Sequence, residues 1–192
     1  MKIGYSVEGS TDRALLKGLH RRWCPEASLI EGKFRGTTGQ SQRREIPNTC
    51  RELMFKGADL IVFLRDANDE NWRDVLKKDE ARCTPQSRDL AVFGVCSRNV
   101  ESWLCCQWSW IASQTGRQPN EFRVDDPKGI FEAALGISRA DRKEEIIANL
   151  VKSAPLKEWL INPSFEDFYE KLWNKGKFIP GCNLENLRQS TL

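Results

Sequence analysis

Histidine and closely spaced cysteines are almost absent from the sequence. Its 192 residues include one histidine, and its seven cysteines are scattered with no Cys-x-x-Cys pair among them. Zinc ribbons and His-rich zinc sites are therefore excluded. An odd number of scattered cysteines is typical of small buried side chains in a reducing compartment, so we expect free thiols.

Long apolar runs are absent as well. No stretch approaches the roughly 20 apolar residues of a membrane span. The first residues lead straight into strand-like sequence, so we expect no signal peptide. Hydrophobic residues make up 40% of the chain and charged residues 30%, an ordinary balance for a globular protein. We expect a cytoplasmic protein without a membrane partner, and the sequence allows a homo-oligomer.

The net charge of +3 is too small for a protein that coats nucleic acid, but the positive charge is unevenly placed. Residues 1–56 hold eleven Lys and Arg against six Asp and Glu. Such a basic part can contact phosphates, although a solvated helix face has the same composition. Arg65 can alternatively pair with nearby carboxylates. The candidate contacts to nucleic acid are five arginines: Arg35, Arg43, Arg44, Arg51 and Arg65.

Strand-like and helix-like segments alternate through the first part of the chain. Apolar, β-rich runs predict four strands, the second of them weaker, at 2–7, within 27–34, at 58–64 and at 90–95. Helical patterns between them predict an α/β protein of the Rossmann-like kind, with a mainly parallel central sheet flanked by helices. After about Thr115 only helical patterns remain. We therefore expect an α/β core, 1–115, and a helical extension packed on it, 116–192.

Several carboxylates follow the predicted strands directly. Glu8 comes after the first strand, Asp66 after the third, and Glu101 a short loop after the fourth, while Asp12 and Asp69 lie close behind. In a parallel sheet these strand ends share one edge, where open α/β proteins build their sites. Each residue also has a plain structural interpretation, because acids favour turns and the first turns of helices.

Carboxylates that converge on one edge repel each other unless a cation lies among them. Oxygen ligands without histidine favour Mg²⁺ or Mn²⁺, which can polarise a phosphoryl oxygen and activate a water molecule. The predicted metal ligands are Glu8, Asp12, Asp66 and Asp69. The predicted catalytic residues are Glu8, Asp66, Asp69 and Glu101.

Three segments together resemble the Toprim-domain family. They are Val7-Glu8-Gly9-Ser10-Thr11-Asp12, Asp66-Ala67-Asn68-Asp69 and Asn99-Val100-Glu101-Ser102-Trp103-Leu104. The chain is most similar to OLD-family nucleases and to small Toprim-like proteins encoded beside ATPases. The resemblance implies a Toprim-like sheet with Mg²⁺ held by Glu8 and Asp66, and Asp12 as a further ligand. The family usually has two aspartates separated by one residue, whereas the second place here is Asn68. Either Asp69 replaces it or metal affinity is reduced.

The residues also separate the activities found among Toprim proteins. Topoisomerases need a nucleophilic tyrosine, but Tyr5 lies within a strand and Tyr169 in an aromatic helix stripe, and primases of this type carry a zinc module. Metal-dependent hydrolysis of phosphodiesters remains, with DNA expected rather than RNA. The resemblance further implies an effector of prokaryotic anti-phage defence that acts with an ATPase from the same operon, because the chain has no GxxxxGK[ST] motif of its own. The alternatives are a catalytically impaired sensor or assembly subunit of such a complex, and a small α/β phosphatase.

Overall fold

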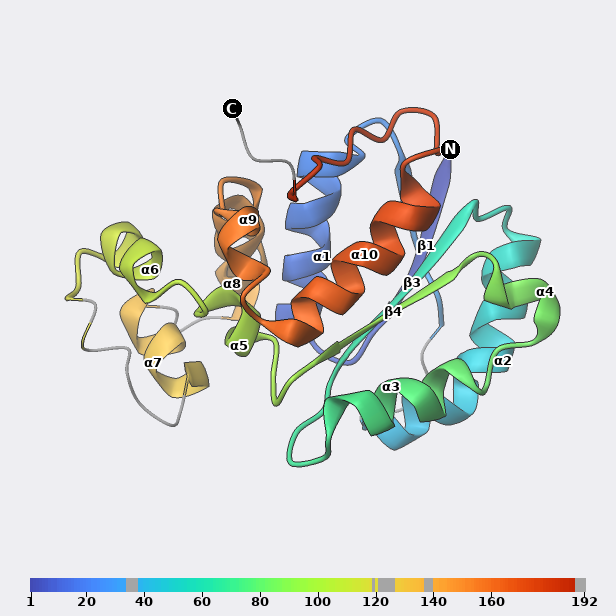
Figure 1. The fold of residues 1–192 in the computed structure, drawn as a ribbon, viewed down its shortest axis with the longest axis horizontal. Helices are drawn as coiled ribbons and strands as arrows, with labels where there is room; N and C mark the ends of the chain where they lie inside the picture. Colours follow the sequence, from blue (N-terminus) through green and yellow to red (C-terminus); the bar gives the residue numbers. More distant parts are fainter. Residues whose placement is uncertain (34–37, 119, 121–126, 137–139, 189–192) are drawn as a thin grey trace.

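A four-stranded parallel sheet forms the centre of the molecule (Figure 1). The computed structural model describes residues 1–33, 38–118, 120, 127–136 and 140–188. The strands lie in the order β2-β1-β3-β4, and all neighbouring pairs are parallel. The α/β class predicted from the sequence is confirmed. The strands span β1 (Lys2–Val7), β2 (Ser28–Glu31), β3 (Leu60–Asp66) and β4 (Ala91–Cys96).

Helices cover both faces of this sheet (Figure 1). In β3, Leu60, Val62 and Leu64 join the core on the side of α1 and α10, whereas Ile61 and Phe63 join the core on the other side. Because both faces are covered, the strand is a continuous apolar run rather than an alternating one. The first face is covered by α1 (Ser10–Trp23) and α10 (Pro163–Gly176), and the second by α2 (Gly39–Phe55), α3 (Trp72–Glu80) and α4 (Pro85–Arg88).

The C-terminal helices belong to the same core as the sheet. Helix α8 (Ala140–Lys152) packs along α1, where Gly18 has no side chain: a Cβ there would lie 2.5 Å from Cβ of Val151. Helix α10 packs on β4. Two short helices follow β4, α5 (Glu101–Leu104) and α6 (Trp108–Thr115), and the other helices of the described residues are α7 (Pro127–Ala134) and α9 (Leu156–Trp159). None of the described helices is long and apolar enough to cross a membrane.

A disulfide bond joins the end of α1 to the tail that follows α10. Cys24 pairs with Cys182, 158 residues away, so the expectation that all cysteines are free thiols is wrong for these two. The tail is also held by a hydrogen bond from the Asn183 N–H to the carbonyl of Trp23. Spacing along the chain carries no signal of a pair so far apart. The other five cysteines are free.

Candidate metal and catalytic site

Four carboxylates lie together at the carboxyl edge of the sheet. Glu8 follows β1, Asp66 ends β3, and Glu101 follows β4 in the first turn of α5, while Asp12 lies in the first turn of α1. Their charges act on one another, because Glu8, Asp66 and Glu101 all raise the pKa of Asp12. The sequence analysis predicted that these four residues converge at one edge, and the ends of the parallel strands bring them together there.

The two carboxylate oxygens of Asp12 differ in their surroundings, since one is hydrogen-bonded at the start of α1 and the other is not hydrogen-bonded. The backbone N–H of Gly9, the N-cap of α1, donates to Oδ2 of Asp12 at 2.7 Å. The other oxygen, Oδ1, is buried and accepts no hydrogen bond, and the residue is only 3% exposed. Burial raises the pKa of Asp12 well above its usual range, and the charge of Asp66 adds to this effect. A buried carboxylate oxygen without a partner is costly unless a ligand satisfies it.

Asp66 is the half-buried member at the end of β3. It accepts a hydrogen bond from the backbone N–H of Val100, while its Oδ1 is buried without a partner. Burial raises the pKa of Asp66 from 3.8 to about 7, and the charges of Glu101 and Glu8 contribute. Full ionisation of the cluster near neutral pH is therefore unfavourable unless a positive charge lies among the carboxylates.

The remaining two carboxylates complete the cluster from either side. Glu8 is half-buried, and its Oε2 is buried without a hydrogen-bond partner. Glu101 is 2% exposed. Cys96, which ends β4, is fully buried, and burial together with the charges of Asp66, Asp12 and Glu101 raises the pKa of its thiol. Cys96 therefore lines the site as a protonated thiol, which is not the nucleophilic form of cysteine.

The turn after β3 corrects the prediction for Asp69. Asn68 has φ of 52°, in the left-handed region that asparagine adopts more readily than most residues. Its N–H donates to the carbonyl of Arg98, which also has a positive φ, 96°. Asp69 follows in this turn and is exposed, whereas the other four carboxylates are buried or half-buried. The structure therefore does not bring Asp69 to the other four carboxylates.

The predicted arginine contacts divide into buried and exposed residues. Arg65 is 5% exposed, donates to the Gly39 carbonyl at 2.7 Å, and lies 3.5 Å from Oδ2 of Asp79. Arg43 pairs with the same buried carboxylate. These two guanidinium groups connect α2 with α3. The guanidinium of Arg65 is therefore used in an internal ion pair and not in a contact with nucleic acid, which corrects the prediction for this residue. The guanidinium of Arg43 is used mostly in the same way. Arg44 and Arg51 are exposed on α2, and Arg35 lies outside the described residues.

Lys128 is a charged residue of the site that the sequence analysis missed. It lies near the start of α7, and its positive charge opposes the upward shift of the Asp66 pKa. In the sequence Lys128 follows no predicted strand, so no pattern of the kind that identified the carboxylates indicates this lysine. Its charge is of the sign that would attract a phosphate to the acidic cluster.

The four carboxylates fit a hard divalent cation in their chemistry. Three buried oxygens without a hydrogen-bond partner, on Glu8, Asp12 and Asp66, are the kind of ligand that Mg²⁺ and Mn²⁺ prefer. Among the described residues, no group of three or more His, Cys, Asp and Glu side chains has the arrangement of a metal site in the present side-chain conformations. The side chains would therefore have to turn toward each other to bind one.

The fold and this edge define the chain as an α/β protein with a buried acidic cluster at the carboxyl ends of its parallel strands. Comparisons with protein-family models, with curated proteins and with solved structures gave no match to the chain. The arguments about its function therefore depend on the residues of the site.

Proposed function

We propose that the protein is a Mg²⁺- or Mn²⁺-dependent nuclease that hydrolyses phosphodiester bonds, with DNA as the expected substrate. One observation carries the proposal: Glu8, Asp12, Asp66 and Glu101 converge at one sheet edge, and Asp12 keeps a buried oxygen without a partner. Like charges buried together are unfavourable, so the arrangement is best explained if a cation offsets them.

The residues divide the work of such a reaction between them. Asp12 and Asp66 would hold the cation through their free oxygens, with Glu8 as a third ligand or as the base that takes a proton from water. A bound divalent cation supplies polarisation of a phosphoryl oxygen and lowers the pKa of water. The exposed Lys128, whose positive charge acts on Asp66, would attract the phosphate. The exposed Arg44 and Arg51 would contact the nucleic-acid backbone away from the reaction, so binding should weaken as salt rises.

The resemblance to Toprim proteins extends the proposal to partners. We expect an effector in prokaryotic anti-phage defence that acts with an ATPase encoded nearby. The two alternatives, an impaired sensor or assembly subunit and a small phosphatase, predict different results in one set of assays. An impaired subunit would cleave nothing itself and its site variants would keep every activity of the complex. A phosphatase would release phosphate from small esters and leave DNA intact.

Cleavage of plasmid DNA tests the proposal directly. We expect the wild-type protein with Mn²⁺ or Mg²⁺ to cleave, and Glu8→Gln to lower the rate by about 10³-fold or more, because a metal ion supplies several kcal/mol of transition-state stabilisation. Asp69→Asn is the matched control, since it removes a carboxylate three residues from Asp66 that lies in solvent. The proposal is wrong if the protein hydrolyses small phosphate esters but not DNA, or if Glu8→Gln cleaves like the wild type.

Changing Lys128 to Gln should separate catalysis from metal binding. Removing this positive charge, which acts on Asp66, should lower kcat by roughly 10–100-fold, because one group that stabilises developing negative charge is lost. Affinity for Mn²⁺ should stay equal or rise slightly, because a repelling charge is gone. The measurement is kcat for cleavage together with Mn²⁺ titration. An unchanged kcat would show that Lys128 has no part in the reaction.

A further inference from the structure

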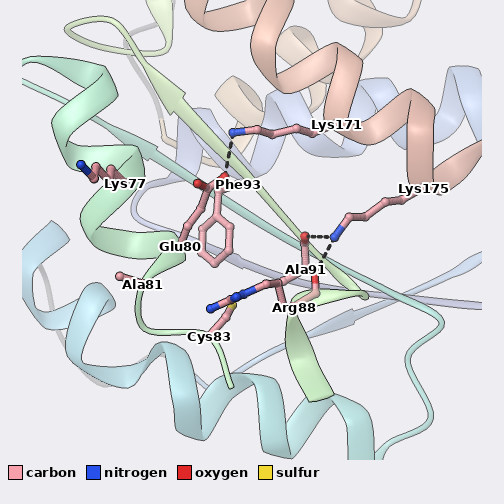
Figure 2. Close-up of a pocket in the computed structure, with 9 residues that line it drawn as sticks. All are labelled: Lys77, Glu80, Ala81, Cys83, Arg88, Ala91, Phe93, Lys171 and Lys175. Atoms are coloured by element: carbon pink, nitrogen blue, oxygen red, sulfur yellow. Dashed lines mark hydrogen bonds and ion pairs between the residues drawn. The ribbon is translucent and has the colours of Figure 1, made fainter. Parts of the chain in front are cut away.

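A cavity of about 450 Å³ opens at the amino end of β4, between this strand, the end of α3, α4 and α10 (Figure 2). Ala91, the first residue of β4, lines the cavity, whereas Cys96, the last one, lies beside the carboxylates. The cavity and the acidic cluster are therefore at opposite ends of the same strand. Sites for small molecules have volumes of roughly 300–1,000 Å³, so the cavity is large enough for an organic ligand.

The charge in the walls of this cavity is mostly positive. Among the described residues, the lining includes one carboxylate, that of Glu80, and four cations, which are Lys77, Arg88, Lys171 and Lys175. Lys171 is compensated, because its ammonium group pairs with Glu80 at 2.7 Å and with Asp167 at 2.9 Å. The single carboxylate of the lining is therefore already paired, and the other three cations give the cavity its charge.

Lys175 is held in place by neutral groups. Its ammonium group donates to the carbonyl of Arg88 at 2.5 Å and to the carbonyl of Ala91 at 2.8 Å. No carboxylate of the described residues forms an ion pair with it, although the charge of Asp89 acts on it from a greater distance. Burial lowers the pKa of Lys175, an effect that a bound anion would oppose. The backbone thus fixes a cation whose charge is left for a ligand.

Arg88 supplies a second cation at the same part of the wall. It is the last residue of α4, and the hydrogen bond from Lys175 to its carbonyl keeps the two residues together. Its guanidinium forms no ion pair with any described residue, and neither does the ammonium group of Lys77. A guanidinium can bind two oxygens of one phosphate group, while an ammonium group binds as a point charge. This combination is suited to a phosphate.

An apolar wall lies among these cations. Phe93 of β4 lines the cavity, and Figure 2 shows its ring with Lys171, Lys175 and Arg88 around it. The ring stacks on that of Phe63, with the ring centres 4.7 Å apart, so its position is fixed from the side of the sheet. An inorganic anion would use only the cations, whereas an anion with an organic body would use the apolar wall as well.

We propose that this cavity binds a small organic phosphate monoester, with the phosphate group at Arg88 and Lys175 and the organic body against Phe93. A phosphate monoester carries about two negative charges at neutral pH, which matches the two cations that have no carboxylate partner there. The inference is independent of the proposed nuclease activity, because none of these residues belongs to the acidic cluster and binding requires no divalent cation.

Calorimetric binding of phenyl phosphate to the whole protein tests the proposal. The buffer contains EDTA at pH 7.5 and little salt, so that the acidic cluster holds no metal and repels the phosphate instead of binding it. We expect one molecule to bind per chain. Inorganic phosphate should bind at least about fivefold more weakly, because it cannot bury apolar surface against the wall of the cavity.

Arg88→Gln should weaken the binding of phenyl phosphate at least about tenfold, and because Arg88 is exposed the variant should fold normally. Arg82→Gln is the matched control: it removes an exposed guanidinium nearby that does not line the cavity, so its affinity should stay within about twofold of the wild type. The inference is overturned if phenyl phosphate does not bind, if inorganic phosphate binds as tightly, or if the two variants have equal affinity.

Discussion

Changing Asp66 to Asn should abolish metal-dependent cleavage and at the same time stabilise the metal-free protein. Asn keeps an oxygen that can accept the hydrogen bond from Val100, but it removes the charge that a cation needs. We expect the cleavage rate to fall by about 10³-fold or more. The measurement is the rate of plasmid cleavage with saturating Mn²⁺, beside the wild type and Asp69→Asn.

The gain in stability follows from the sign of the pKa shift. The pKa of Asp66 in the folded protein, about 7, lies above its ordinary value of 3.8, so the folded state holds the proton more tightly than the unfolded state. The stability that this residue contributes is fully present below about pH 3.8 and is lost as the pH rises through 7. Asn does not lose a proton. At pH 8 without metal, Asp66→Asn should therefore unfold at higher urea, with a gain of roughly 1–3 kcal/mol.

Addition of Mn²⁺ should reverse this order of stability. The wild type should gain stability from the metal in proportion to its occupancy, whereas Asp66→Asn should gain little. A variant that is less stable than the wild type without metal at pH 8 would show that burial does not leave the charge of Asp66 uncompensated.

Loss of the Cys24–Cys182 disulfide should lower the free energy of unfolding more than any other single substitution outside the core. The bond closes a loop between residues 158 apart, and Cys182→Ala should lower the free energy of unfolding by about 2–5 kcal/mol. Part of the tail stays bound, because Arg22 pairs with Glu185 and the Tyr169 hydroxyl bonds the backbone of Glu185 and Leu187. Urea unfolding without reductant measures the effect.

Cys106→Ala is the control for this experiment. It removes a free thiol, and its effect should stay below about 1 kcal/mol. Reduction of the wild type with dithiothreitol should reproduce the loss seen in Cys182→Ala. Equal stability of the variant and the wild type, with reactive thiols at Cys24 and Cys182 in the native protein, would contradict the bond.

The sheet could be predicted from the sequence because its signal is local. A strand covered on both faces must be apolar throughout, and 58–64 and 90–95 are, so their positions agree with β3 and β4 to within about two residues. Glu8, Asp66 and Glu101 could be placed together for the same reason, since parallel strands end at one edge.

The remaining features depend on backbone angles or on contacts between distant segments. Asp69 was expected at the site because it is close to Asp66 in the chain, but the left-handed Asn68 turns it away. Arg65 is adjacent to Asp66, yet its guanidinium points to Gly39 and Asp79. The positive charge of Lys128 acts on Asp66 only because α7 packs near the sheet edge. Cys24 meets Cys182 only because the C-terminal tail returns to the end of α1. None of these has a signature in the local sequence.

Binding of Mn²⁺ by calorimetry tests the central claim, that the buried carboxylates and not Asp69 hold a divalent cation. The samples are the wild type, Asp12→Asn and Asp69→Asn at pH 8. Asn at position 12 can still accept the Gly9 hydrogen bond, so the start of α1 should be preserved. We predict binding to the wild type, equal binding to Asp69→Asn, and at least about tenfold weaker binding to Asp12→Asn, the loss of one charged ligand. No binding to the wild type, or a loss confined to Asp69→Asn, would contradict the account.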